Sequence, residues 1–291
     1  MQKLSGVFCA FWTPTDSGGE ILWPALEHNL DFVLRSGIHG FMALGTTGEY
    51  LHLSFEQRKQ IVERLVRTGL PVFVNVSDPS HRNALEMARA AKQFGAAAAA
   101  VMAPWYFPMA QRDVAEFIAR IGKDAEMPLV LYNYPEVTGK KLEPDTIRAI
   151  ASRTRVIAMK QSGTEFAYHH DLLRLGRELS FDLFTGNDTR FEEALRLGCA
   201  GSVGGLMNAL PDIGRKIWDN FQAGQPSPRE TAFLTEVAQS ISAVEFPLNV
   251  KALLEARGLQ TGELKNPVSP DSWRAYEKLR DDFKLLLSTI L

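Results

Sequence analysis

Residues 156–163 read VIAMKQSG, an apolar run that ends directly in a lysine. Such a run is typical of a buried strand, yet burying an ammonium group costs free energy unless the group is paired or loses its charge. Alternation along a strand places Val156, Ala158 and Lys160 on one face. The stretch therefore predicts a strand that ends in a lysine held above small apolar side chains.

Similar apolar runs recur along the chain. Because they are continuous rather than alternating, they suit parallel strands that are covered on both faces. Their starts lie roughly 20 to 35 residues apart, the length of a strand, a loop and a returning helix. The other seven runs begin at Gly6, Gly40, Pro71, Ala96, Pro128, Phe181 and Gly201.

The stretches between these runs carry helix start and stop signals. Ser54 is a predicted N-cap, Gln57 completes a capping box with it, and Gly69 is a predicted stop. A second helix is expected over residues 80–95, and Pro144 suits the first turn of another. Strands and helices are therefore expected to alternate.

Eight strand–helix units fill the chain as far as Phe221, and such units close most naturally into a (β/α)8 TIM barrel. The turn-rich stretch QPSPRE at residues 225–230 precedes three helical stretches without a strand. We therefore expect an α/β barrel at residues 1–224 and a C-terminal helical appendage at residues 225–291. The rival is an open doubly wound sheet, but residues 13–20, TPTDSGGE, do not match its G-x-G-x-x-G loop.

The composition narrows the classes of protein that need to be considered. With 32 Lys and Arg against 34 Asp and Glu, the near balance of charge argues against nucleic-acid binding and against a polybasic membrane surface. No run of about 20 apolar residues predicts a membrane span. Cys9 and Cys199 lie in apolar stretches and are expected to be buried free thiols. With no signal-peptide pattern at the N-terminus, a cytoplasmic location is expected.

Active sites of such barrels lie at the carboxyl ends of the strands, so the residues that end each run are the candidates. The scattered histidines show no spacing typical of a metal site, and no metal or organic cofactor is expected. The run ends are GTTGE at residues 45–49, Tyr106, Tyr132, Lys160, TGND at residues 185–188 and GSVGG at residues 201–205.

Lys160 is the most informative of these candidates. Burial favours the neutral, nucleophilic form of an amine, which condenses with a ketone to a Schiff base and allows an adjacent carbon–carbon bond to break. Tyr132 on the neighbouring strand could carry the proton, and the 45–49 turn could bind a carboxylate. The structural alternatives are a lysine that reaches the rim or pairs with Glu49, a core tyrosine and an ordinary turn.

Four motifs in this order resemble the dihydrodipicolinate synthase / N-acetylneuraminate lyase family of class I, Schiff-base-forming pyruvate aldolases. They are GTTGE, YNYPEVTG, the lysine that closes the sixth strand, and GND, and the resemblance covers essentially the whole chain. It implies that Lys160 forms the Schiff base and that Tyr132 is the general acid/base. It further implies that Thr46 and Thr47 hold the carboxylate of a 2-keto acid such as pyruvate.

The resemblance also implies roles beyond these four residues. Thr46 would relay protons between Tyr132 and Tyr106, the latter reaching in from an adjacent subunit of a homotetramer built as a dimer of dimers. The positions that would line the pocket or contact substrate hydroxyls are Gly186, Val203, Asp188 and Ser162.

Two departures from the family pattern bear on the substrate. Val137 stands where the synthases carry an arginine that binds a second carboxylate, and valine cannot replace that bidentate contact. Thr189 stands where sialic acid lyases carry an acidic residue. The YNYP segment resembles the 2-keto-3-deoxy sugar-acid aldolases.

We therefore predict a pyruvate-dependent aldolase that cleaves or forms a small 2-keto-3-deoxy or 4-hydroxy-2-keto acid. The alternatives within the family are a dehydratase or hydratase-aldolase that uses the same imine, and a dihydrodipicolinate-synthase-like enzyme without the usual arginine. A barrel that binds a phosphorylated substrate is disfavoured because residues 185–188 and 201–205 contain no Lys or Arg. A non-catalytic sensor of keto acids is the alternative from another class.

Overall fold

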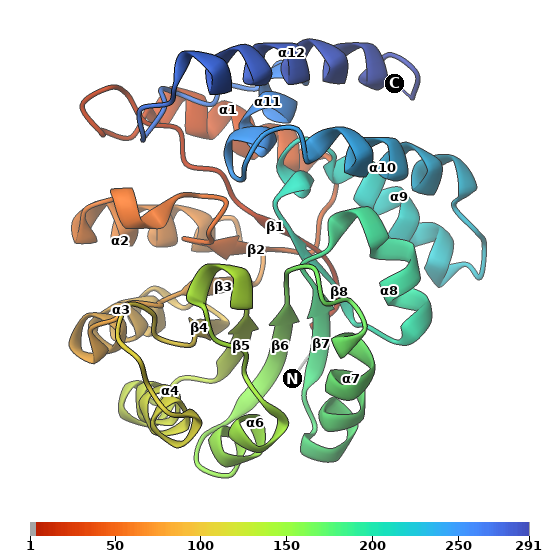
Figure 1. Cartoon of the computed structure of the whole chain (residues 1–291). Coiled ribbons are helices and arrows are strands. Elements are labelled where there is room, and N and C mark those ends of the chain that lie inside the picture. Colours follow the sequence, from red (N-terminus) through yellow and green to blue (C-terminus); the bar gives the residue numbers. More distant parts are fainter. Residues whose placement is uncertain (1–3, 291) are drawn as a thin grey trace.

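The computed structural model describes residues 4–290 and contains a parallel barrel in which each strand pairs with the next and the first pairs with the last (Figure 1). This confirms the predicted (β/α)8 fold. The strands are β1 (Gly6–Ala10), β2 (Gly40–Ala43), β3 (Val72–Asn75), β4 (Ala98–Met102), β5 (Leu129–Asn133), β6 (Val156–Gln161), β7 (Asp182–Thr185) and β8 (Gly201–Gly204).

Helices follow each strand and cover the outside of the barrel. They are α1 (Trp23–Arg35), α2 (Phe55–Val66), α3 (His81–Phe94), α4 (Gln111–Ala125), α6 (Pro144–Ala151), α7 (Tyr168–Leu179), α8 (Phe191–Leu197) and α9 (Pro211–Gln222). Four short helices lie in the loops at the rim: α5 (Pro135–Thr138) and the 3-10 turns η1 (Tyr50–His52), η2 (Asp188–Arg190) and η3 (Leu206–Asn208).

The predicted helix ends match the observed ones closely. Ser54 caps α2 with a complete capping box: its Oγ accepts from the N–H of Gln57, whose side chain accepts from the N–H of Ser54. The helix stops at Val66, and Gly69 follows with a positive φ of 79°. Ser80 and Gly95 bound α3 as expected.

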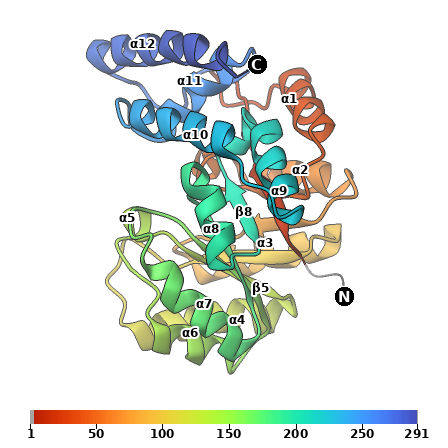
Figure 2. The ribbon, with the colours of Figure 1, turned by 90° about the vertical axis from the view of Figure 1, so that its right-hand side faces the viewer.

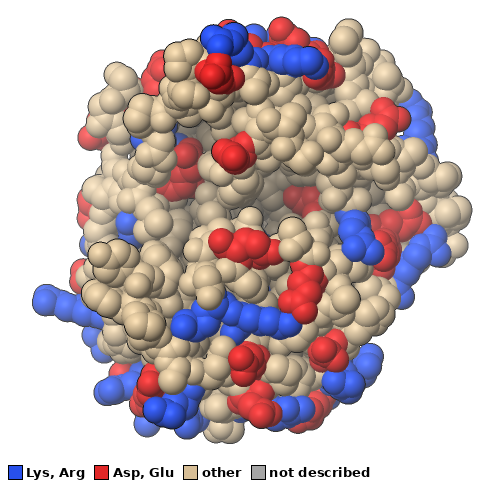
Figure 3. All heavy atoms as spheres, in the orientation of Figure 1, with Lys and Arg blue, Asp and Glu red and all other residues tan. Residues whose placement is uncertain are grey.

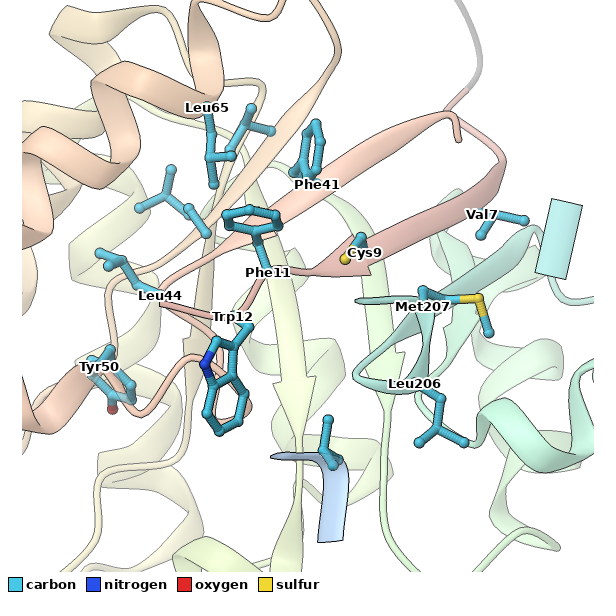
Figure 4. Packing of buried hydrophobic residues seen from close by; sticks show 14 of the residues in the cluster. Val7, Cys9, Phe11, Trp12, Phe41, Leu44, Tyr50, Leu65, Leu206 and Met207 are labelled. Atoms are coloured by element: carbon cyan, nitrogen blue, oxygen red, sulfur yellow. The ribbon is translucent and has the colours of Figure 1, made fainter. Parts of the chain in front are cut away.

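The inside of the barrel is filled by alternate residues of the strands. Phe8 stacks on Phe73 with ring centroids 4.8 Å apart, and the edge of Phe184 contacts both rings. The opposite faces of the strands pack against the helices, as for Cys9, which is buried, and Phe41 (Figure 4). A dry, aromatic base therefore supports the open end of the barrel.

One expectation about β6 is wrong. Val156 packs in the outer layer with the helices, whereas Ile157 contacts the inner cluster. The pairing with β5 explains the difference, because Leu129 pairs with Val156 while the next residue, Val130, pairs with Ala158. One extra residue on β6 thus reverses the alternation below Ala158. Ala158, and not Val156, lies beneath Lys160 on the inner face.

Three helices complete the chain after the barrel: α10 (Pro228–Ile241), α11 (Leu248–Ala256) and α12 (Pro270–Leu287). They lie together on one side of the barrel, near α1 and α9 (Figure 2). Trp12, just after β1, donates its indole N–H to the carbonyl of Thr261 at 2.9 Å. The division of the chain into two units at residue 224 stays a prediction. Within the described residues, no helix is both long and apolar enough to cross a membrane.

We predict that Phe184→Ala lowers the free energy of unfolding by about 3–5 kcal/mol, because it leaves a cavity between two rings that cannot close in. Phe184 is 0% exposed, with its ring centroid 5.3 Å from that of Phe8. Urea denaturation measures the effect. The control is Leu285→Ala on α12, a residue 73% exposed, which should change stability by less than about 0.5 kcal/mol. Equal effects of the two substitutions would contradict the prediction.

Candidate active site

The carboxyl ends of the strands open into a cavity of about 570 Å³. Figure 3 shows a hollow near the middle of this face, with basic and acidic side chains interspersed around it. Seven of the nine predicted site residues line the cavity: Thr47, Tyr132, Lys160, Ser162, Gly186, Asp188 and Val203.

Lys160 is buried at the floor of this cavity, with 5% of its surface exposed. Its Nζ lies 3.7 Å from the sulfur of Met42 and 4.3 Å from the centroid of the Tyr132 ring. Glu49, the carboxylate considered above as a partner, binds Lys265 instead at 2.9 Å. The amine of Lys160 therefore faces weak, polarisable neighbours, which leaves it available as a nucleophile.

Tyr132 stands beside Lys160 because the two residues pair in register on β5 and β6. Its hydroxyl lies 3.2 Å from that of Thr46, and either group can donate the hydrogen bond. The ring of Tyr134 is stacked against that of Tyr132, and burial raises the pKa of Tyr134 to about 12. The arrangement places a proton-carrying phenol within reach of the lysine and of a second hydroxyl.

The turn at residues 45–49 presents Thr47 to the cavity and directs the hydroxyl of Thr46 to that of Tyr132. Glycine is required at Gly48, because a Cβ there would lie 2.8 Å from the carbonyl oxygen of Phe11. Glycine at Gly205 makes room for Thr47, whose Oγ1 would otherwise be 2.7 Å from a Cβ. The hydroxyl of Thr47 therefore reaches the cavity because the loops that contain Phe11, Gly48 and Gly205 pack closely together.

Gly186 on the β7 loop is also shaped by the site. A Cβ at this position would overlap the hydroxyl of Ser162 and come within 3.1 Å of the Cε of Lys160. The N–H of Gly186 donates to the carbonyl of Gln161 at 2.7 Å, which holds the loop against β6. The absence of a side chain here leaves the lysine a straight path into the cavity.

Asp188 is buried at the end of β7 and faces the cavity. Its Oδ2 accepts from the N–H of Leu206 at 2.8 Å, whereas Oδ1 has no hydrogen-bond partner within residues 4–290. Burial raises the pKa of this carboxyl to about 6, although the N–H of Leu206 and the charge of Lys160 oppose the shift. Oδ1 lies against Gly204, where a Cβ would overlap it, so only glycine at this position leaves room for the carboxyl.

The remaining two predicted residues lie outside the cavity lining. Thr46 is connected to the cavity lining by its hydrogen bond with Tyr132. Tyr106 is 84% exposed, has a positive φ of 78° and packs edge-on against Phe107. Within one chain Tyr106 is therefore not part of the site, and its predicted contribution to a neighbouring subunit stays a prediction.

Several lining residues were not predicted. Tyr134 lies two residues after Tyr132, and this spacing of 2 along the same strand end was a signal that could have found it. Arg190 follows Asp188 on the same loop. Phe246 and Asn249 come from the loop before α11 and from α11 itself, and no local sequence pattern connects them with the barrel.

The charged groups at the site do not form a metal centre. No group of three or more His, Cys, Asp or Glu in the part of the chain that the structure describes is arranged to hold a metal ion. Arg190 is already engaged, because its guanidinium binds Glu193 at 2.7 Å and lies 3.6 Å from the centroid of the Phe166 ring. Arg190 is therefore not a free cation in this cavity.

A sequence model of the dihydrodipicolinate synthetase family matches residues 3–286. The chain belongs to this family. It is a family of Schiff-base-forming pyruvate aldolases, so the protein is an enzyme of the lyase class, as the resemblance implied. Among curated relatives, a 4-hydroxy-tetrahydrodipicolinate synthase of Staphylococcus haemolyticus is 27% identical over 91% of each chain. A protein named probable 2-dehydro-3-deoxy-D-pentonate aldolase of Escherichia coli is 24% identical over 87% of this chain and 91% of its own.

Solved structures of family members agree with the fold. A dihydrodipicolinate synthase of Thermotoga maritima is 25% identical, has a TM-score of 0.88 and is matched over 98% of this chain and 99% of its own. A prophage protein of the family from E. coli, solved in complex with pyruvate, has a TM-score of 0.89 at 22% identity, over 97% of this chain and 98% of its own. At 22% identity, the similarity to the prophage protein is evidence for a shared fold alone.

The position at which the resemblance to the synthases implies an arginine is open to solvent in this chain. Val137 is 42% exposed and does not line the cavity. The preceding Glu136 accepts from the N–H and the hydroxyl of Thr164 at 2.6 and 2.9 Å, and so ties the loop after β5 to the loop after β6. Next to Val137, hydrogen bonds between Glu136 and Thr164 therefore connect the two loops.

We predict that Asp188→Asn stabilises the protein at neutral pH but not in acid. Because the folded-state pKa of Asp188 is raised from 3.8 to about 6, the fold favours the protonated carboxyl, and wild-type stability falls as pH rises between these values. The amide that replaces the carboxyl in the variant does not ionise, so the stability of the variant does not fall in this way. The stability of the variant relative to wild type should thus rise by about 2 kcal/mol between roughly pH 4 and pH 7. Urea denaturation at both pH values measures it, and a difference independent of pH would contradict the prediction.

Proposed function

We propose that this enzyme is a pyruvate-releasing aldolase that acts on a small 2-keto-3-deoxy or 4-hydroxy-2-keto acid through a Schiff base on Lys160. The observation that carries the proposal is the buried amine of Lys160 beside the ring of Tyr132, whose hydroxyl reaches Thr46. A nucleophilic amine and a proton carrier are the two groups that the reaction requires.

The proposed reaction begins when the amine of Lys160 adds to the C2 ketone. Tyr132 donates its proton to the departing C2 hydroxyl, so that water leaves and an iminium ion and a tyrosinate remain. Tyr132 then accepts the proton of the C4 hydroxyl, either through the carboxylate of the substrate or through Thr46. The C3–C4 bond breaks, its electrons pass to the iminium as an enamine, and an aldehyde leaves. Protonation of the enamine at C3 and hydrolysis of the imine release pyruvate and restore the free amine.

The carboxylate of the keto acid is assigned to the turn at residues 45–49. Thr47 is 5% exposed and lines the cavity, and Thr46 already bonds Tyr132. Hydroxyls and backbone N–H groups in such a turn bind an anion without a neighbouring cation. This placement leaves the ketone carbon next to Lys160.

The other half of the cavity favours an uncharged, hydroxylated aldehyde. Its wall carries hydroxyl or amide groups at Ser162, Thr164, Asn187 and Thr189, and the carboxyl of Asp188 would repel a second anion. The named function of the E. coli pentonate aldolase relative supports the same class of substrate.

The cations of the cavity support the same conclusion. Lining residues within the described chain include two cationic side chains, Lys160 and Arg190, and Arg190 is occupied by Glu193 and Phe166. A phosphate or a second carboxylate would therefore find no free charged partner.

Relatives named as synthases support a second candidate function, which is condensation at the same imine, but Val137 stands where such a substrate would need an arginine. Product analysis for a free aldehyde separates cleavage from dehydration and from condensation.

We also propose a homotetrameric assembly in which Tyr106 reaches a neighbouring subunit. Its exposure, together with the 68% exposure of Phe107, leaves a pair of aromatic rings in solvent in a single chain. A solved relative at 26% identity is described as a monomeric synthase variant, so assembly varies within the family. Analytical ultracentrifugation of this chain and of Phe107→Asp tests the assembly.

Incubation with pyruvate followed by borohydride should add a pyruvyl-sized mass to Lys160, because reduction traps the imine as a stable secondary amine. Mass spectrometry of the intact protein and of its peptides locates the adduct. Lys160→Ala is the control and should gain no mass. Absence of the adduct from the wild-type protein removes the Schiff-base mechanism.

Tyr132→Phe should lower turnover roughly 10²- to 10⁴-fold, since it deletes the proton carrier and keeps the ring against Lys160. Borohydride trapping of pyruvate should still occur, if more slowly. Tyr134→Phe is a matched control two residues along, for which the loss should be much smaller. Near-normal turnover of Tyr132→Phe, read by coupling released pyruvate to lactate dehydrogenase, would exclude this residue from the mechanism.

A further inference from the structure

A second cavity of about 420 Å³ lies between the barrel rim and the helical appendage and has no role in the mechanism above. Trp12 and Glu49 form its barrel side. The loop between α10 and α11, which includes Val244 and Phe246, and the connection to α12, which includes Val268, form the other side. Its volume suits a small organic molecule.

The most unusual group in this cavity is a buried lysine. The side chain of Lys265 is 3% exposed, and its Nζ donates to Glu49 and to the carbonyl of Thr13, both at 2.9 Å. An ammonium group has three N–H donors. Within residues 4–290, two of the three have acceptors, so one donor is left for a ligand in the cavity that Lys265 lines.

The charges next to Lys265 are of opposite sign. Burial lowers the pKa of Lys265, the charge of Glu49 opposes this, and the nearby ammonium of Lys251 lowers it further. Lys251 itself is saturated, because it binds Glu255 at 2.9 Å, the carbonyl of Gly262 and a hydroxyl. An added carboxylate would compensate the cost of burying Lys265 as an ammonium.

The rest of the cavity wall combines apolar surfaces with acidic and polar side chains. The Trp12 ring lies with its centroid 5.1 Å from the Nζ of Lys265, and Val244, Pro247 and Val268 extend the apolar surface. Glu245, Glu263 and Asp271 also line the cavity, but all three are exposed, so water screens their charges. The buried cation therefore outweighs the acidic rim.

We propose that this cavity is a binding site for a small organic monocarboxylate with an apolar body, whose carboxylate accepts the free N–H of Lys265 and whose body packs against Trp12 and Val268. The ligand class follows from one unfilled cationic donor beside the apolar side chains of Trp12, Val244, Pro247 and Val268.

The site is connected to the catalytic residues by two contacts. Glu49, the partner of Lys265, donates its backbone N–H to the carbonyl of Thr46 at 3.0 Å. Phe246 lines both cavities. A ligand that draws Lys265 away from Glu49 or displaces Phe246 thus alters the catalytic turn or the cavity wall. This second step rests on the proposed aldolase function, whereas binding itself does not.

Isothermal titration calorimetry with phenylacetate tests the site, with phenethylamine as a probe of similar shape and opposite charge. The variants are Val268→Trp, which fills the second cavity, and Lys160→Ala, which alters the catalytic one. Leu285→Trp, on the exposed face of α12, is the matched control for the added ring. Circular dichroism establishes that each variant is folded, and Lys265→Gln gives an independent test that leaves the cavity open.

Phenylacetate should bind the wild type with a Kd below about 1 mM, at least about tenfold more tightly than phenethylamine. Binding should persist in Lys160→Ala and Leu285→Trp and should weaken at least about tenfold in Val268→Trp and Lys265→Gln. No binding to the wild type, or equal binding of both probes, overturns the proposal. Loss in Lys160→Ala with retention in Val268→Trp assigns phenylacetate to the catalytic cavity and also overturns it. None of these outcomes depends on turnover.

Discussion

The amine of Lys160 lies in a place that a charged group occupies only at a cost, between a thioether and an aromatic ring and away from bulk water. Much of the structure serves to keep it there. The register of β5 and β6 places Tyr132 beside it, and Ala158 below it leaves no polar group to solvate it. A barrel supplies this environment because its strands all end at one rim while its interior is closed by side chains.

The division between base and rim explains how stability and chemistry are kept apart. The base is aromatic, with Phe8, Phe73 and Phe184 in mutual contact, and none of the three lines the cavity. The rim is built from small residues, and glycines such as Gly186 let loops approach closely enough to leave a cavity rather than fill it. Relatives named for different reactions share the fold, which is consistent with loop changes that alter the substrate while the base stays the same.

The helical appendage contributes to the site as well as to the packing. Phe246 and Asn249 reach the catalytic cavity from a part of the chain that has no strand. The ion pair between Lys265 and Glu49 holds the appendage to the turn that carries Thr46 and Thr47, and Trp12 adds a hydrogen bond to Thr261. Any ligand, mutation or subunit contact that moves the appendage therefore acts on the catalytic turn through a short chain of contacts.

The sequence by itself determined the repeating strand–helix units, the capped ends of α2 and α3, and the order in which Thr46, Tyr132, Lys160 and Asp188 follow their strands. These features depend on residues close together in the chain, and a parallel barrel necessarily gathers the strand ends at one rim. Only the tertiary structure decided the rest. The extra residue in β6 is apparent only in the pairing with β5. Glu49 binds Lys265, a residue far along the chain, instead of Lys160. Phe246 and Asn249 line the cavity because the last helices fold back over the barrel. Contacts of this kind join segments that are distant in sequence, so their geometry is set by packing rather than by local propensity.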